Sequence, residues 1–306
     1  MTNKFKLIGY KNIFENFIQL YDKNCLPNKI LLTGNKGIGK SLFVKHFLSY
    51  IYSINDINKY NFQDFEINNL SKSSILIENN SHPNIFNIFK KHDKKNIEIS
   101  QIREMIQFLN KSSFNNKIRF IIVNDLQYFN LSSTNAILKS LEEPNNNVIF
   151  ILINDSSDCI QDTLKSRCIE FKLFLNNQDV KLIVNNYFNE NVYDLISKDF
   201  QNIYNSPSFL ISLITFFNEN DLNIDNCSIE QLIIKIIKNK FYLKNQFINQ
   251  NLNFFIELFF FKNINHSKNV SFQIKEYFYL KLSQLRKYNL DLETFFIEFE
   301  EKLLSE

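Results

Sequence analysis

Three of the four glycines in this 306-residue chain fall within one six-residue window, in the segment GNKGIGKS. The segment satisfies the pattern GxxxxGK[ST], in which glycine allows positive φ and a close approach of the backbone to a phosphate group. The apolar run at residues 29–33 predicts a buried strand before the loop, and residues 41–52 predict a helix after it. A strand, a glycine loop and a helix in this order predict a phosphate-binding P-loop.

Each part of this loop has an expected task. The backbone N–H groups and the N-terminus of the following helix would face phosphate oxygens. Lys40 would neutralise the charge of the β- and γ-phosphates, and the Ser41 hydroxyl would ligate the Mg²⁺ that accompanies the nucleotide. We therefore expect ATP or ADP to bind here, with Mg²⁺ if it is bound. The predicted nucleotide-binding residues are Gly34, Asn35, Lys36, Gly37, Ile38, Gly39, Lys40 and Ser41.

A short strand is expected at residues 97–99, and apolar runs at residues 118–123 and 148–153 predict two further strands, buried in a parallel sheet. Periodic stripes at residues 100–109 and 132–141 predict helices between them. Strands that alternate with helices indicate an α/β fold with helices on both faces of the sheet.

Two other stretches have a different character. Residues 53–81 are polar, rich in Asn and weakly periodic, which predicts a long irregular connection. After Phe171 the strand patterns stop, and the remaining chain has helical periodicity. We therefore expect a domain boundary close to that residue.

Charge and cysteine content limit the class of protein. The formal net charge is +3, so no strong electrostatic field for nucleic acid is expected, and any DNA contact would be local. Cys25, Cys159, Cys168 and Cys227 lie far apart without CxxC spacing, which predicts reduced thiols and no zinc site. The N-terminus lacks an apolar signal-peptide core. We expect a soluble, cytoplasmic protein that does not enter a membrane.

Several motifs together resemble the AAA+ clamp-loader family. The stretch NAILKSLEEP at residues 135–144 precedes LKSRC at residues 164–168, and HPN stands at residues 82–84. With the P-loop, these motifs follow the family order over roughly residues 25–210. Within the family the chain is similar to the delta-prime type of subunit in the bacterial DNA polymerase III clamp loader.

The resemblance implies an architecture and a set of partners. It predicts an AAA+ P-loop NTPase domain with a parallel sheet at residues 1–172, a small helical lid at 173–215 and an all-α collar at 216–306. The expected partners are gamma/tau and delta subunits in a hetero-pentameric ring, and indirectly the sliding clamp and primer–template DNA. No membrane partner is expected.

The chain departs from the hydrolysing members of the family at two places. Those members end the second nucleotide strand in an Asp-Glu pair, whereas this chain has Asn124 and Asp125, a degenerate Walker B motif. An amide cannot supply the negative charge that supports Mg²⁺, and Asp125 would start from the opposite face of the strand end. Their lid also carries an arginine where Ser208 stands here. Own ATP hydrolysis is therefore expected to be weak or absent.

Two further expectations come from the resemblance. Asn154 or Asp155 would occupy a polar sensor position after the strand at residues 148–153. Family members often have a four-cysteine zinc module before HPN, but residues 53–81 contain no cysteine. A zinc ion is therefore not expected as a cofactor.

Arg167, within the SRC motif, is the expected catalytic residue. The resemblance implies that it acts in trans, as an arginine finger that balances charge on the phosphoryl group of a neighbouring subunit. The alternative is a surface arginine in an ordinary ion pair.

The sequence leaves three functions open. The leading one is a delta-prime-like subunit that supports ATP-dependent loading of the sliding clamp onto primed DNA. The second is an ATP-hydrolysing motor of the gamma/tau type that uses Lys40, Ser41 and Asp125 in cis. The third is a small-molecule P-loop kinase, for which the chain has neither a recognisable acceptor site nor an arginine-rich lid.

Overall fold

The computed structural model describes residues 6–91, 94–111, 114–143, 147–156, 160–225, 227–263, 272–288 and 290–304. The chain divides into two compact units. The first comprises residues 1–187 together with 206–208, and the second comprises residues 188–205 and 209–306.

The first unit contains a five-stranded parallel sheet in the order β2-β3-β4-β1-β5. The strands are β1 (Lys29–Gly34), β2 (Ile85–Ile88), β3 (Arg119–Val123), β4 (Val148–Asp155) and β5 (Ile169–Lys172). The three central strands are almost continuously apolar and buried, as expected for parallel strands covered on both faces.

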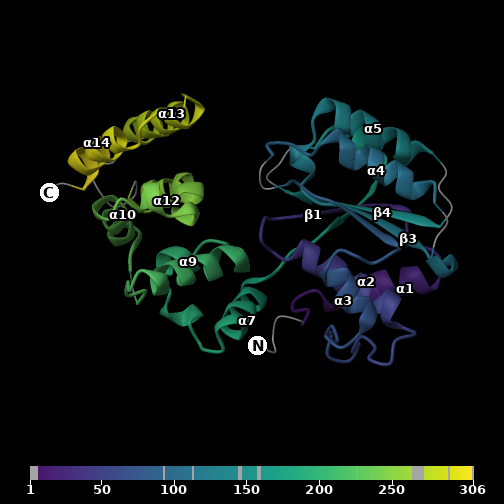
Figure 1. The fold of residues 1–306 in the computed structure, drawn as a ribbon. Coiled ribbons are helices and arrows are strands. Elements are labelled where there is room, and N and C mark those ends of the chain that lie inside the picture. The colour runs from purple at the N-terminus through teal and green to yellow at the C-terminus, as the bar shows by residue number, and fades with distance from the viewer. Residues whose placement is uncertain are drawn as a thin grey trace. The chain divides into compact units, whose positions relative to one another are not determined.

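Helices cover both faces of this sheet. Figure 1 shows α1 (Lys11–Asp22), α2 (Lys40–Ser53) and α3 (Lys72–Glu78) on one side, and α4 (Ile99–Leu109) and α5 (Leu131–Glu142) on the other. Shorter elements are η2 (Phe114–Asn116), η3 (Leu126–Tyr128) and α6 (Asp162–Lys165), and α7 (Asn177–Phe188) follows the sheet. The predicted α/β architecture, a parallel sheet with helices on both faces, is confirmed.

One apolar cluster joins the sheet to its α4 and α5 side. Ile102 and Met105 of α4, Ile137 and Leu141 of α5, and Leu164 of α6 are all buried in it. Their spacing of three or four residues within each helix places them on one face, so burying that face against the strands fixes the orientation of both helices.

The second unit is helical throughout its described residues. Its elements are η4 (Tyr193–Leu195), α8 (Lys198–Gln201), most of α9 (Pro207–Glu219), α10 (Ile229–Lys238), α11 (Phe241–Lys244), α12 (Gln246–Asn263), α13 (Phe272–Tyr288) and α14 (Glu293–Leu303). The predicted helical remainder of the chain is thus confirmed. The division into a lid at 173–215 and a collar at 216–306 stays a prediction.

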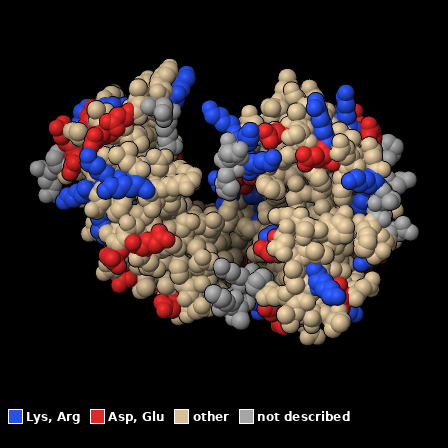
Figure 2. Space-filling view, viewed as in Figure 1, with Lys and Arg blue, Asp and Glu red and all other residues tan. Residues whose placement is uncertain are grey.

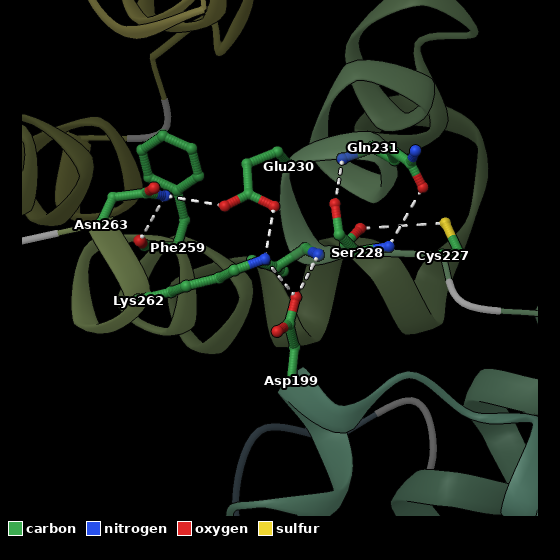
Figure 3. A network of polar contacts seen from close by, with 9 residues as sticks. Asp199, Cys227, Ser228, Glu230, Gln231, Phe259, Lys262 and Asn263 are labelled. Atoms are coloured by element: carbon green, nitrogen blue, oxygen red, sulfur yellow. Dashed lines mark hydrogen bonds and ion pairs between the residues drawn. The ribbon is translucent and has the colours of Figure 1, made fainter. Parts of the chain in front are cut away.

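A polar network links three helices of this unit. The Lys262 ammonium lies 2.9 Å from Asp199 Oδ2 and 2.9 Å from Glu230 Oε2, as Figure 3 shows. Asp199 Oδ2 also accepts the backbone N–H of Ile229, the first residue of α10. Ser228 and Gln231 complete a capping box at the same helix end. These polar contacts therefore connect α8, α10 and α12 around the Lys262 ammonium.

The predicted strand at residues 97–99 is wrong. Ile97 is buried and its N–H bonds to the carbonyl of Tyr128, but α4 already begins at Ile99. The strand beside β3 is instead β2, at residues 85–88. Its sequence IFNI contains an asparagine, which interrupts the apolar run, so the strand could not be recognised in an Asn-rich chain.

The predicted irregular connection at residues 53–81 contains a helix, α3. The Ser71 hydroxyl accepts the N–H of Ser74 and caps this helix. Asp56 accepts hydrogen bonds from the hydroxyls of Ser71 and Ser73, and these bonds outweigh burial and lower its pKa. A local network therefore orders a stretch without strong apolar periodicity.

Charges are mixed on the surface. Figure 2 shows basic and acidic side chains interspersed on the visible face of each unit. In the part of the chain that the structure describes, no helix is both long enough and apolar enough to cross a lipid bilayer.

Candidate nucleotide-binding site

A cavity of about 570 Å³ lies at the carboxyl ends of the central strands. Its walls come from the loop after β1, the end of β3, the end of β4 and the start of α9. Open parallel sheets bind ligands at this end because the loops that leave neighbouring strands meet there. Gly34 pairs with Asp155 in the sheet, so the glycine loop and the end of β4 are neighbours by register.

Two glycines give the loop its shape. Gly37 has a φ of 80° and Gly39 a φ of 91°, both in the left-handed region that favours glycine. Gly39 also caps the N-terminus of α2, so the free N–H groups of that helix open onto the loop. This is the local geometry predicted for a phosphate cradle.

Ser208 lies directly against the loop. Its N–H donates to the carbonyl of Gly37 at 3.3 Å, and its Cβ would be 2.7 Å from a Cβ built on Gly37. The start of α9 therefore contacts the loop through a small, uncharged side chain.

The Lys40 ammonium is held by three oxygens. It lies 2.8 Å from the carbonyls of Gly34 and Asn35 and 2.7 Å from Asp155 Oδ1, and the side chain is only 5% exposed. A buried ammonium needs such partners, since an unpaired charge in this setting is costly. A phosphate oxygen that binds Lys40 would therefore have to replace one of these three oxygens.

The two residues after β3 both line the cavity. Ser41 Oγ donates to Asn124 Oδ1 at 3.1 Å. Asp125 has a φ of 60°, which turns its side chain to the same cavity. This differs from the expectation of opposite faces, because β3 ends at Val123 and strand alternation stops with it. The hydroxyl of Ser41 and the carboxylate of Asp125 are oxygen donors that suit Mg²⁺, so the residues fit a nucleotide-borne ion.

The end of β4 distinguishes the two sensor candidates. Asp155 lines the cavity and contacts Lys40, whereas Asn154 is buried and its amide donates to the carbonyl of Asp155 at 2.6 Å. Alternation along the strand sends the two side chains to different faces. Asp155 is thus the candidate that faces the loop.

Two loop contacts were not predicted from the sequence. The buried phenol of Tyr10 donates to the carbonyl of Ile38 at 2.8 Å, and Ser156 Oγ donates to Asn35 Oδ1 at 2.6 Å. Neither partner has a sequence signal, because the contacts join the loop to segments 28 and 121 residues away.

Arg167 lies outside this cavity, after α6. Its guanidinium pairs with Glu142 at the end of α5, and the side chain is 35% exposed. Neighbouring Cys168 is half-buried just before β5, and burial raises the pKa of its thiol to about 11. This disfavours a reactive thiolate.

The histidines and the HPN motif have structural surroundings. Burial lowers the pKa of His46 to about 3, and burial with the charge of Lys117 lowers that of His82 to about 4. The Asn84 side chain exchanges two hydrogen bonds with the backbone of Phe114. Among the described residues, no group of His, Cys, Asp or Glu is arranged to hold a metal ion by itself.

The chain is similar in sequence to several subunits of DNA polymerase III. The chain is 25% identical over 140 residues to the delta-prime subunit of DNA polymerase III from Pseudomonas aeruginosa, which covers 46% of this chain and 41% of that protein. It is 24% identical over 255 residues to the gamma subunit from Buchnera aphidicola of Schizaphis graminum, covering 80% and 67%. The chain spans about half the length of the curated delta-prime relatives that it matches.

Among solved structures, a DNA polymerase III gamma-subunit-related protein from Thermotoga maritima aligns with a TM-score of 0.46 at 15% identity, over 95% of this chain and 97% of that one. The profile of the family described as "DNA polymerase III, delta subunit" matches residues 9–176. Because this match spans more than half of the chain, the chain belongs to the DNA polymerase III delta subunit family and is delta-prime-like.

Proposed function

We propose that the chain is a delta-prime-like subunit of the DNA polymerase III clamp loader in the cytoplasm. It binds ATP or ADP at residues 34–41 and supports ATP-dependent loading of the sliding clamp onto primed DNA. The observation that carries the proposal is an intact loop beside altered catalytic positions. Lys40 and Ser41 are present in the loop. At the altered positions, the uncharged Asn124 accepts a hydrogen bond from Ser41, and the uncharged Ser208 donates one to Gly37.

The charge of the cavity supports binding without efficient turnover. Lys40 is the one cation among the described residues that line it, and Asp125 and Asp155 add two carboxylates. Phosphoryl transfer depends on positive groups around the transferred phosphate. The bound nucleotide would thus be mainly structural, with its Mg²⁺ held by Ser41.

Catalysis would be supplied to a neighbour. Arg167 lies outside the cavity of its own chain, and its partly exposed guanidinium is the candidate arginine finger for the ATP of the adjacent subunit. The proposed partners are gamma/tau and delta subunits in a hetero-pentameric ring, with the clamp and primer–template DNA bound by the assembly.

A second candidate is a gamma-type motor that hydrolyses its own ATP. It is supported by the gamma relative that matches 80% of this chain and by Asp125, which lines the cavity next to Asn124. In that case Lys40, Ser41 and Asp125 act in cis, and the isolated chain turns over ATP.

The test uses the ring reconstituted with gamma/tau and delta subunits, and DNA-stimulated ATP hydrolysis is measured with Arg167→Ala or Lys40→Ala in this chain. We expect Arg167→Ala to lower the rate at the adjacent site by about a hundredfold or more. Lys40→Ala should leave most of the rate. An unchanged rate with Arg167→Ala overturns the proposal, and loss with Lys40→Ala alone supports the motor.

A further inference from the structure

Three hydrogen bonds hold the guanidinium of Arg167 within its own chain. The Nε–H donates to Glu142 Oε1 at 2.9 Å, and an Nη2–H donates to the same oxygen. An Nη1–H donates to the carbonyl of Thr163 at 2.8 Å. Every nitrogen of the guanidinium therefore has one partner, and the plane of the group is set.

The backbone on both sides of this contact is anchored in one apolar core. Glu142 follows Leu141, which is fully buried, and Arg167 comes three residues after Leu164, which is 4% exposed. Leu141 and Leu164 belong to the same buried cluster. The contact thus joins two short segments whose positions the core already determines.

Stability does not account for such a contact. The Glu142 side chain is 54% exposed and that of Arg167 is 35% exposed, and ion pairs at such sites contribute little to folding because water screens them. The contact instead restricts the conformational freedom of the Arg167 side chain. A free arginine side chain has many rotamers, whereas three hydrogen bonds hold this one in a single geometry.

The bonding pattern leaves a specific part of the guanidinium available. The group has five N–H donors, of which these contacts use three, one on each nitrogen. One hydrogen remains on Nη1 and one on Nη2. These two N–H groups on the terminal nitrogens remain to donate to phosphate oxygens.

We propose that Glu142, together with the Thr163 carbonyl, is the positioning residue for Arg167 and presents its remaining N–H groups to a phosphate of the neighbouring subunit's nucleotide. The inference rests on the proposed trans role of Arg167. Glu142 does not touch the nucleotide. It acts by removing the rotamer freedom that Arg167 would otherwise lose in the transition state.

The test measures steady-state ATP hydrolysis of the reconstituted ring with Glu142→Ala, Arg167→Ala and the double variant in this chain, and Glu104→Ala as the control at an exposed helical glutamate. We expect Glu142→Ala to lower kcat by about tenfold with KM for ATP unchanged. The double variant should be no slower than Arg167→Ala, because Glu142 has no role without the arginine.

The conservative variant Glu142→Gln keeps an acceptor oxygen and should recover part of the rate. Gel filtration of each ring shows whether it assembles. If the ring with Glu142→Ala does not assemble, the kcat of the ring with Glu142→Gln is used instead. A kcat equal to or above that of the unmodified ring overturns the inference, and an increase identifies Glu142 as a restraint on Arg167. Additive losses in the double variant also overturn it. If Arg167→Ala itself has no effect, the proposed function fails instead.

Discussion

The Nζ atom of Lys40 lies 2.7 Å from Oδ1 of Asp155, within the cavity at the ends of the central strands. The two residues are 115 positions apart in sequence, and the pairing of β1 with β4 brings them together. A nucleotide phosphate that binds Lys40 must compete with this carboxylate. Asp155 therefore opposes phosphate binding both by holding the lysine and by its own charge.

This relationship predicts that Asp155→Asn tightens nucleotide binding. We expect the Kd for ADP with Mg²⁺ to fall by about tenfold, since the amide removes one negative charge next to the phosphate site. Isothermal titration calorimetry on the purified chain measures it, with Asp225→Asn as the control at an exposed aspartate. Unchanged or weaker binding by Asp155→Asn would contradict the competition.

The two loop glycines should differ in their tolerance to alanine. Both have positive φ, so each alanine variant pays a backbone strain of about 1–2 kcal/mol. At Gly37 a Cβ would also lie 2.7 Å from Ser206 Oγ and Ser208 Cβ, whereas at Gly39 the nearest atom is 3.9 Å away. Urea unfolding should show the larger loss of stability for Gly37→Ala. Equal losses of stability in the two variants would mean that Ser206 and Ser208 move away from the new methyl group without an energetic penalty.

The stability of the protein should depend on pH through two histidines. His46 and His82 have pKa values of about 3 and about 4 in the folded chain, below the ordinary value. As pH falls below about 6.5, only the unfolded chain takes up these protons, so the free energy of unfolding falls by up to about 1.4 kcal/mol per pH unit for each histidine. Above that pH their contribution is fully present.

Urea titrations between pH 7.5 and pH 4.5 measure this slope. The double variant His46→Gln, His82→Gln should lose most of the slope in the range from about pH 6.5 to about pH 5, above the range in which carboxylates titrate. An equal slope in the double variant would assign the pH dependence to other groups.

The polar network in the second unit predicts a local loss of stability when Lys262 is removed. Lys262→Ala leaves the carboxylates of Asp199 and Glu230 facing each other, with side chains only 18% and 28% exposed (Figure 3). Because water still reaches them, we expect a cost of about 1–2 kcal/mol. Amide hydrogen exchange in α10 and α12 measures it, and Lys238→Ala is the exposed control. Equal protection in both variants would show that the network is not needed there.

Local sequence patterns predicted most of the first unit. The P-loop, its strand and its helix depend on glycine at positive φ and on apolar periodicity within one short segment, and these features are encoded where they act. The buried strands β3 and β4 and the change to helix after β5 were predictable for the same reason. Where the pattern was weak, prediction failed. β2 was missed because an asparagine interrupts its apolar residues, and the strand expected at residues 97–99 is a buried residue followed by the start of α4.

The tertiary structure decided which side chains meet. The pairing of β1 with β4 places Asp155, and not Asn154, beside Lys40. The left-handed backbone conformation of Asp125 brings its side chain to the same cavity as Asn124. The contacts of Ser208 with Gly37 and of Glu142 with Arg167 also join distant segments. A sequence states which groups a chain carries and what local backbone they favour. The distances between those groups are set only when the core has packed, so which side chains line this cavity together depends on the fold.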